Sequence, residues 1–533
     1  MSPSKLHGFA QVRASLTPAL LFAVIFGSLG SLTFAYDNGW WGSALGEAAF
    51  NEFYGQMTSA AGTPTLSATQ QSSGTALGTA GIMIGCMVAP DFSRRFGRRM
   101  SFVALGITAI IGSIIQITSI LGPASRTNGS KFWQLIAGKI VVNASVGVAS
   151  TVVPVYLGEV APSNIRGLIV NVYSIVQNIG GILATGTVYG TQYRTDKLGW
   201  VLPIGLQMLV PLIMILGTPF LPESPRWLIE TNQIDKALRS VKRLRVSGFD
   251  AEREVNDLYA AMKHHEDIAG GSSYIDLFKS KGGNLRRTLI VLSMGCLQQG
   301  QGISAVNNYF VVTLMAMKIK DVIGLLLILQ SCGLVFNFLV SMLGPDRFGR
   351  RPLLLIGSAV MFVCMYVVAG IAAGTGGNPS VPEQRTIVAA FFIWVLIFSV
   401  SWGPLTWTVT AETPSAALRE KSIALGAWSG YAVGLIVNFI QPYMANPEYG
   451  NLGGMTEFIY GGFSPIAFVW VYFMIPEFKG RSLEQLDEMF EAKVPTRDFA
   501  TYECITTIHG DDSEGQATQD VSEKETAEHK ETA

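Results

Sequence analysis

The sequence predicts an all-α membrane protein with 12 transmembrane helices, arranged as two parallel six-helix halves with short cytoplasmic helices between them. Three observations predict this fold: the composition, a series of apolar runs of spanning length, and an internal repeat. Of the 533 residues, 49% belong to the nine apolar types and only 14% are charged, against about 25% in soluble domains. A soluble protein of this length would need a more polar surface.

The composition also excludes several classes of function. Lys and Arg together number 38, as do Asp and Glu, so no net charge attracts nucleic acid. The five cysteines are scattered, without a CxxC motif or a Cys/His cluster, so the sequence indicates neither a disulfide framework nor a metal site. No nucleophile–base pair and no phosphate-binding loop is recognisable. We therefore expect no enzymatic activity and no cofactor.

The apolar runs divide the chain. A spanning helix needs about 20 mostly apolar residues, and the first six such runs lie near residues 18–38, 74–90, 102–121, 134–157, 168–188 and 199–221. The second six lie near residues 288–312, 322–344, 353–373, 387–409, 422–444 and 458–475. The polar stretch between the two sets has a charged, helix-forming composition that predicts short surface helices. The expected divisions are an N-terminal segment 1–17, a first half 18–221, a central loop 222–287, a second half 288–476 and a tail 477–533 with a disordered end.

Basic residues predict the orientation, because short cytoplasmic loops of membrane proteins are enriched in Lys and Arg. Most of the 38 basic residues fall on one side of the predicted spans, so we expect both termini in the cytoplasm. The polar N-terminus leads directly into the first apolar run, which we interpret as a retained span rather than a cleaved signal peptide. The sequon at Asn128 then falls outside, where it predicts a glycan.

The second half repeats the first in order and register. The motif Arg-Phe-Gly-Arg-Arg at residues 95–99 recurs at 347–351, and Pro-Glu at 222–223 recurs at 476–477. Each repeat lies about 253 residues further along the chain. Six spans is an even number, so both halves enter the membrane from the same side. Two such halves are related by an axis along the membrane normal, with a site between them near the midplane.

Six kinds of motif occur together in order. They are Arg-Phe-Gly-Arg-Arg at 95–99 and 347–351, Pro-Val-Tyr at 154–156, Pro-Glu-Ser-Pro-Arg-Trp-Leu at 222–228, Gln-Gln at 298–299, Trp-Gly-Pro-Leu-Thr-Trp at 402–407 and Pro-Glu-Phe-Lys-Gly at 476–480. In these motifs the chain resembles the sugar porters of the major facilitator superfamily, in particular their fungal branch, over about residues 18–490. The resemblance implies the major facilitator fold and alternating-access transport of a sugar or a sugar-like polar metabolite.

Two charges lie inside the predicted spans, where each costs about 2.5–3.5 kcal/mol at the centre of a helix even on the lenient insertion scale. Asp37 ends the first span, and Lys139 lies near the start of the fourth. Proton-coupled members of the family pair an acid at the first position with an Arg at the second, so the resemblance implies a proton-coupling pair. The corresponding residues of the second half are Ile290 and Phe392, which confines the feature to one half. The alternatives are a pair that only neutralises itself, or an Asp37 solvated at the interface.

The cytoplasmic loops predict a gate of ion pairs that exists only while that side is closed. Its members are Arg98, Arg99, Glu159, Arg166 and Glu223 in the first half, and Asp346, Arg350, Arg351, Glu412, Arg419 and Glu477 in the second. The alternative is that the arginines only set the topology. The first loop departs from the family pattern, because it has Arg94 where the second has Asp346, and an acid only one turn earlier at Asp91.

The seventh span is rich in amides and hydroxyls, which would be wasteful on a helix that faces only lipid. It contains Gln298, Gln299, Gln301, Ser304, Asn307 and Asn308, with Gly300 and Gly302 where a gating helix would bend. By the resemblance, Gln298, Gln299 and Trp407 contact the sugar. The alternative is that the two glutamines only bond neighbouring helices.

Smaller groups replace three amides of the family pattern. Ser174 stands in the fifth span with Gln177 one turn further on, Ser304 in the seventh, and Gly430 beside Tyr431 and Trp428 in the eleventh. The pocket should therefore be wider than that of a standard hexose carrier and suit a larger or less hydroxylated ligand. The expected substrate contacts are Gln298, Gln299, Ser304, Asn308, Trp407, Gln177, Ser174 and Tyr431.

We therefore expect a monomeric secondary active transporter in the plasma membrane that moves a sugar or a sugar-like polar metabolite, with proton symport. Its expected partners are the substrate, protons and membrane lipid. Three alternatives stay open: a facilitative uniporter, an exporter of a secondary metabolite, and a nutrient sensor that does not transport. The outer loop at 39–73 carries no Lys or Arg but five aromatic residues near its start, and it could form a lid.

Overall fold

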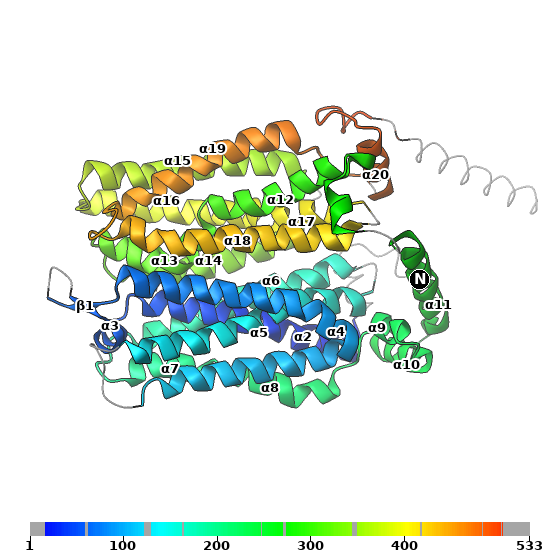
Figure 1. Ribbon diagram of the computed structural model, residues 1–533, viewed down its shortest axis with the longest axis horizontal. Helices are drawn as coiled ribbons and strands as arrows, with labels where there is room; N and C mark the ends of the chain where they lie inside the picture. The colour runs from blue at the N-terminus through cyan, green and yellow to red at the C-terminus, as the bar shows by residue number, and fades with distance from the viewer. Residues whose placement is uncertain are drawn as a thin grey trace, which may run out of the picture.

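The computed structural model describes residues 16–58, 62–121, 129–162, 165–246, 248–269, 273–343, 349–415, 418–481, 483–502 and 504. Helices dominate these residues and form two bundles that lie side by side (Figure 1). The blue and cyan bundle holds the first half, and the green to orange bundle holds the second. This arrangement confirms the predicted all-α membrane fold.

The spanning helices have the following bounds. The first bundle contains α2 (Pro18–Ala44), α4 (Ala68–Thr118), α5 (Ser130–Val160), α6 (Arg166–Thr191), α7 (Leu198–Leu206) and α8 (Leu209–Gly217), followed by the turn η3 (Thr218–Phe220). The second bundle contains α12 (Asn284–Gly300), α13 (Ile303–Ala316), α14 (Val322–Leu343), α15 (Arg350–Gly374), α16 (Val381–Val400), α17 (Trp402–Glu412), α18 (Arg419–Ala445) and α19 (Glu457–Met474).

Shorter elements mark the two ends of the bundles (Figure 1). One end, which we call the lid end, carries α3 (Ala48–Tyr54) and an antiparallel pair of strands, β1 (Met57–Thr58) and β2 (Pro64–Thr65). The opposite end, which we call the basic end, carries α9 (Pro225–Glu230), α10 (Ile234–Leu244), α11 (Ala251–Ala269) and α20 (Leu483–Glu491). The central loop thus forms short helices, as its composition predicts.

The described helices account for all twelve spans. Nine helices or broken helices among the described residues are long and apolar enough to cross a membrane. One of them, the 51-residue α4, contains two predicted runs, because Gly97 (φ 88°) turns the chain within it. Helices α6 and α14 cover the fifth and eighth predicted runs and complete the set. The prediction of twelve spans is confirmed.

Helices α4 and α5 pack through glycines, which let two backbones approach closely in a membrane protein. A Cβ atom added to Gly85 or to Gly147 would lie 2.1 Å from a carbonyl oxygen of the partner helix. A larger residue at either position would therefore push the helices apart. Gly78, two turns from Gly85 on α4, lies against the side chain of Lys139 on α5. The absence of a side chain at Gly78 leaves room for Lys139, whose ammonium reaches α2.

Three spans are broken along their length, between α7 and α8, between α12 and α13, and between α16 and α17. The second break falls at Gly302, whose φ of 97° suits glycine, and a Cβ atom there would lie 2.8 Å from Tyr460. The seventh span is thus interrupted at one of the two glycines where a bend was predicted, and its bending during gating stays a prediction. The break at Ser401, between α16 and α17, was not predicted. Non-helical backbone at this depth is tolerated where it is buried in protein or lines a cavity.

Candidate functional site

The two charged residues predicted inside the membrane meet in the first bundle. Asp37 on α2 and Lys139 on α5 form an ion pair, with 2.7 Å between Lys139 Nζ and Asp37 Oδ2. Asn143, one turn along α5, donates to the same oxygen at 2.8 Å, and the Trp40 indole donates to Oδ1 at 3.3 Å. The Asp37 side chain is 0% exposed. It is therefore not solvated in this conformation, and both its oxygens have donors.

Two indole rings cover the ammonium of this pair. Lys139 Nζ lies 5.0 Å from the ring centre of Trp41 and 5.5 Å from that of Trp40, within the range of cation–π attraction. The Trp41 indole also donates to Thr75 on α4 at 2.9 Å, which fixes the ring. A cation held by ring faces as well as by a carboxylate keeps a partner when the carboxylate is neutralised.

These two tryptophans correct one detail of the sequence analysis, which placed them in the lid loop. Trp40 and Trp41 belong to α2 and are fully buried. The loop proper begins with α3, which we call the lid, and its rings at Phe50, Phe53 and Tyr54 pack against Trp200 of α7. The loop boundary was misjudged because α2 continues for a turn and a half beyond the polar residues that end its apolar run.

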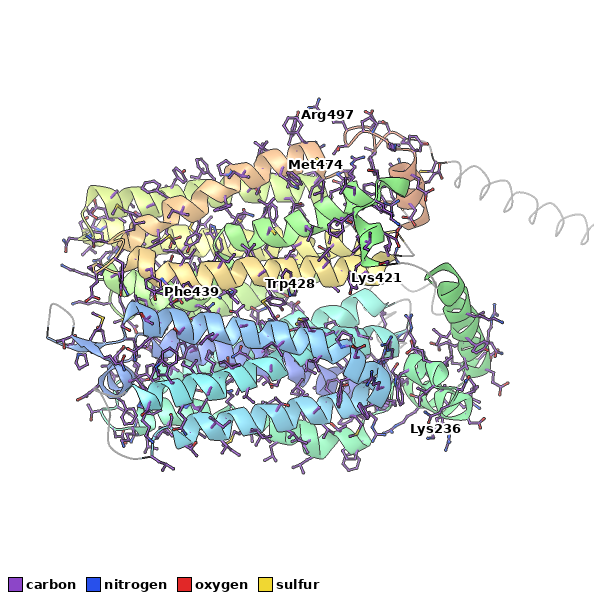
Figure 2. The ribbon with its side chains drawn as sticks, viewed as in Figure 1. Lys236, Lys421, Trp428, Phe439, Met474 and Arg497 are labelled. Atoms are coloured by element: carbon purple, nitrogen blue, oxygen red, sulfur yellow. The ribbon has the colours of Figure 1, made fainter. Side chains whose placement is uncertain are left out.

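Helices α4 and α18 join the two halves toward the lid end. Ser72 Oγ donates to the carbonyl oxygen of Phe439 at 2.6 Å, and the Asn438 amide donates to Thr79 Oγ1 at 3.1 Å. The Tyr309 hydroxyl on α13 reaches the carbonyl oxygen of Gln71 on α4 at 3.3 Å. Figure 2 shows Phe439 on α18 beside the blue α4. We call these contacts the lid-end junction, and they hold the halves together at that end.

The sequence analysis missed the lid-end junction. Its signal was present, since Asn438 is an amide in an otherwise apolar run and Thr79 is a hydroxyl in another. Polar side chains of this kind bond helices to one another in membranes. The pairing was not predictable, because it depends on how the two halves lean together.

A small cavity of about 20 Å³ in the second bundle brings four predicted substrate contacts together. Gln298 and Gln299 of α12, Trp407 of α17 and Tyr431 of α18 all line it. The Trp407 side chain is half exposed, as a ring that receives the C–H face of a ligand must be. Trp428, also half exposed, lies on the side of α18 nearest the first bundle (Figure 2).

The cavity wall is ordered by side-chain bonds at the helix breaks. The Gln298 amide donates to the carbonyl oxygen of Trp402 at 2.9 Å, where α17 begins. Ser304 donates to Gln299 Oε1 at 2.5 Å and so orients that amide. Gln298 therefore bonds a neighbouring helix, as the alternative interpretation held, and lines the cavity as well.

The remaining predicted contacts lie elsewhere. The Asn308 amide donates to Asn438 Oδ1 at 3.2 Å, so in this conformation Asn308 supports the residue whose own amide reaches Thr79 at the lid-end junction. Ser174 and Gln177 are partly buried on α6 of the first bundle, and they do not line the cavity of the second bundle. The structure thus brings together half of the predicted set.

An equivalent ion pair lies at the basic end of each half. Arg98 holds Glu159 through two bonds of 2.7 and 2.9 Å, and Arg350 holds Glu412 at 3.0 Å. All four side chains are less than a quarter exposed, so salt screens these pairs less than it screens surface pairs. Both pairs lie within a half, not between halves, and in this conformation they brace each half separately.

A second carboxylate in each half caps the adjacent turn. Glu223 accepts the main-chain N–H groups of residues 98–99 at 3.1 and 3.2 Å, and Glu477 accepts those of residues 350–351 at 2.9 and 3.1 Å. The glycine before each turn has φ of 88° or 86°. Burial raises the pKa of Glu223, although these donors oppose the shift.

The other predicted gate residues are less informative. Asp91 pairs with Arg94 of its own turn at 2.8 Å, and both side chains are mostly exposed. Arg419 begins α18. Asp346, the sequon residue Asn128 and the side chain of Arg166 lie outside the described residues, as does the tail beyond residue 504.

Known proteins match the chain over most of its length. The family model for sugar (and other) transporters matches residues 23–490. Hexose transporter 2 of Kluyveromyces lactis is 30% identical over 499 residues, which cover 90% of this chain and 84% of that protein. The major facilitator-type transporter ecdD of Aspergillus rugulosus is 28% identical over 527 residues, covering 93% and 91%.

Among solved structures, the inward-open xylose transporter XylE of E. coli superposes with a TM-score of 0.72 at 23% identity, covering 88% of this chain and 99% of that one. Two six-helix bundles, broken helices around a polar cavity and a buried charge pair define a multi-pass membrane transport protein. The chain belongs to the sugar transporter family, the sugar porters of the major facilitator superfamily. This confirms the resemblance carried by its motifs.

Proposed function

We propose that the protein is a proton symporter that moves a sugar or a sugar-like polar metabolite across the plasma membrane by alternating access. The observation that carries the proposal is the buried pair of Asp37 and Lys139. Burying two charges costs several kcal/mol per ion before their attraction is counted. A carrier that needed no titratable group would be as stable with apolar residues in their place.

The position of the pair supports a coupling role. Asp37 lies on α2, and five residues further along the same helix Gly42 meets α13 of the other half. A Cβ atom at Gly42 would lie 3.1 Å from the carbonyl oxygen of Asn307. A change in how Asp37 holds α2 against α5 is therefore transmitted directly to the contact between the halves.

Protonation of Asp37 is the coupling step. The charged carboxylate binds Lys139, Asn143 and Trp40. A proton on Oδ2 removes the charge that holds Lys139, whose ammonium then rests on the ring faces of Trp40 and Trp41. Breaking a buried pair costs about 3–5 kcal/mol, a difference of the size needed to reverse a two-state equilibrium. A proton entering through 100 mV releases about 2.3 kcal/mol, more than a tenfold gradient of substrate requires.

The ligand binds at the cavity wall of the second half. The amides of Gln298 and Gln299 supply donors and acceptors for hydroxyl groups, and Trp407 supplies a ring face. Gly430 in the same wall leaves room that an amide fills in the family pattern. This combination supports a ligand that is polyhydroxylated but larger or less hydroxylated than glucose.

The proposal includes an orientation with the basic end in the cytoplasm, because cytoplasmic loops are enriched in Lys and Arg. Lys236 of α10 and Lys421 at the start of α18 both lie toward that end (Figure 2). An epitope inserted at residue 236 should be stained only after permeabilisation of the cells. Staining of intact cells would reverse the orientation.

The experiment that tests the function is uptake of a labelled panel by cells that lack their own hexose carriers. The panel holds hexoses, pentoses, polyols, disaccharides and quinate, each measured with and without an uncoupler. Uncoupler-sensitive accumulation of one class is the expected result. Uptake that equilibrates and ignores the uncoupler would make the protein a uniporter. No uptake, from protein shown to reach the cell surface, would contradict the import function.

A further inference from the structure

A second cavity lies in the first bundle, apart from the wall formed by α12, α17 and α18. It is a hollow of about 180 Å³ between α2, α6 and the pair α7–α8, which has room for the polar end of a ligand but not for a whole drug-sized molecule, since such sites typically have about 300–1,000 Å³. Tyr36, Thr187 and Gln207 give it a polar side, while Leu183 and Leu209 are among its apolar lining residues. The transport function proposed above makes no use of it.

The cavity lies beside the point where the hydrogen-bond ladder of the sixth span is interrupted. Helix α7 ends at Leu206 and α8 begins at Leu209. Pro211 has no N–H group to donate to the carbonyl of Gln207 four residues earlier, and its ring would clash with that carbonyl in a continuous helix. The hydrogen-bond ladder is therefore interrupted at residues 207–208, although both keep helical backbone angles, and the Gln207 side chain lines the space between the helices.

Gln207 is the residue that indicates a ligand. Its side chain is 2% exposed, yet neither the oxygen nor the nitrogen of its amide has a hydrogen-bond partner in the described structure. A buried polar group left in this state costs about 1–3 kcal/mol. Beside it, the Tyr36 hydroxyl already has two partners, the carbonyl oxygen of Pro203 at 3.1 Å and the side chain of Thr187. The Gln207 amide thus offers the cavity a donor and an acceptor, a set that complements a hydroxyl group.

The apolar side of the cavity faces the bilayer. Leu183 and Leu209 are 50% and 54% exposed on spanning helices, where the surrounding medium is lipid. The described residues that line the cavity carry no charge, so a phosphate headgroup finds no ionic partner. Gln207 also lies about 14 Å along the helix from Leu198, the first residue of α7, at a rise of 1.5 Å per residue. A phospholipid would have to bury its headgroup to reach that depth.

We propose that this cavity binds a sterol, a neutral membrane lipid with one hydroxyl group on a rigid apolar body. The hydroxyl enters the hollow and bonds the Gln207 amide, and the ring system lies outside it, against the exposed side chains of Leu183 on α6 and Leu209 on α8. The bound sterol gives the buried amide its missing partner and stabilises the sixth span at that point. The site is independent of the sugar cavity and of the Asp37 pair.

The test uses the full-length protein purified into lipid nanodiscs and a photoactivatable, clickable sterol. Wild-type protein should be labelled saturably on peptides of α6 to α8, and excess unlabelled sterol should compete. Gln207→Leu should lower that labelling at least fivefold, whereas Leu216→Ala, on the exposed face of α8, should leave it unchanged. Gln207→Leu removes an unpaired amide, so it should fold, and added sterol should raise the unfolding midpoint of the wild type but not of this variant.

A second variant keeps the proposal testable if Gln207→Leu folds poorly. Leu183→Trp fills the cavity from its lipid side, and it should also lose saturable labelling. Labelling spread over all lipid-facing helices, or unaffected by both variants, would overturn the proposal. So would equal labelling and competition by a phospholipid probe. An unfolding midpoint of the wild type that does not change with added sterol would overturn the proposal too, because the cavity would then hold only water.

Discussion

The two halves of the molecule agree at the basic end and differ in the membrane. Arg98 with Glu159 repeats as Arg350 with Glu412, and the turns beside these pairs have nearly the same backbone geometry. Inside the membrane, the first half contains a charge pair, and the second half contains a broken helix lined with amides. The difference separates the scaffold that both halves need in order to move from the chemistry that each half performs alone.

This division implies that coupling is a property of the contact between the halves. The titratable pair lies on α2 and α5, and the ligand wall on α12, α17 and α18. No step of proton uptake touches the ligand directly. The contact of Gly42 with α13 and the lid-end junction are the described routes between the two.

We expect the largest effect, a loss of substrate accumulation, from a change in the charge pair of the first half. Asp37→Asn leaves a neutral side chain of the same shape beside Lys139, so the proton site is lost while the packing is kept. Accumulation against a gradient should be abolished, and counterflow exchange should stay measurable in the same vesicles. Asp91→Asn, on an exposed side chain of α4, is the matched control and should transport normally. Accumulation by Asp37→Asn would remove the coupling role.

The lid is a second feature in which the two halves differ, and its stability should depend on pH. The first half inserts α3 between α2 and α4, whereas residues 317–321 suffice to join α13 to α14. Glu47, at the start of α3, is buried with both carboxylate oxygens unpaired, and burial raises its pKa to about 7. Between about pH 4.5 and 7 the folded lid binds a proton that the unfolded chain has released.

The stability of the lid should therefore fall as the pH rises through this window, by roughly 3 kcal/mol in full. Hydrogen exchange of residues 48–54, corrected for intrinsic rates, measures the change between pH 5 and pH 8. In Glu47→Gln, the corrected hydrogen-exchange rates of these residues should be the same at pH 5 and pH 8. An unaltered pH response in that variant would assign the effect to another group.

The shared scaffold should respond equally in both halves. Glu223→Gln and Glu477→Gln each replace a carboxylate that accepts two main-chain N–H groups with an amide that has one acceptor oxygen. Each should lower the free energy of unfolding by about 1–3 kcal/mol, with the two values within about 0.5 kcal/mol of one another. Denaturant midpoints in detergent give the comparison. A large loss in one half alone would show that the two turns share their backbone geometry but contribute unequally to the free energy of unfolding.

The smallest effect should come from the ligand wall. Gln299→Ala removes one amide that Ser304 orients, so the apparent affinity for the transported ligand should fall several-fold while sensitivity to the uncoupler is kept. Gln233→Ala, an amide of the central loop, is the control. Unchanged affinity in Gln299→Ala would move the ligand away from α12.

Much of this arrangement could be predicted from the sequence, because it depends on local pattern or on the repeat. Apolar run length predicts the spans, and Gly302 predicts the interruption of the seventh. Asp37 and Lys139 could be paired because a lone charge in a membrane is costly and each was the other's available partner. That Asn143 and two indoles complete the site was not predictable, since it depends on the helical phase of α2 against α5.

Other parts depend on distances that no local pattern contains. Asn308 lies on the seventh span with the other amides, and sequence alone could not tell that it bonds Asn438 at the lid-end junction. The break at Ser401 has no proline or glycine at that residue, and the chain there adopts ψ −95°. Pro211 is visible in the sequence, but the cavity near it depends on the space that α2 and α6 leave open.

The indole faces over Lys139 give this carrier an optical reporter. Indole emission responds to the local electric field, and the field at Trp40 and Trp41 changes when Asp37 gains a proton or the ammonium shifts by a fraction of an ångström. The chain contains ten tryptophans, so the difference spectrum between the wild type and Trp41→Phe isolates the signal. The protonation state of the carrier can then be followed in unlabelled protein, during turnover, by light alone.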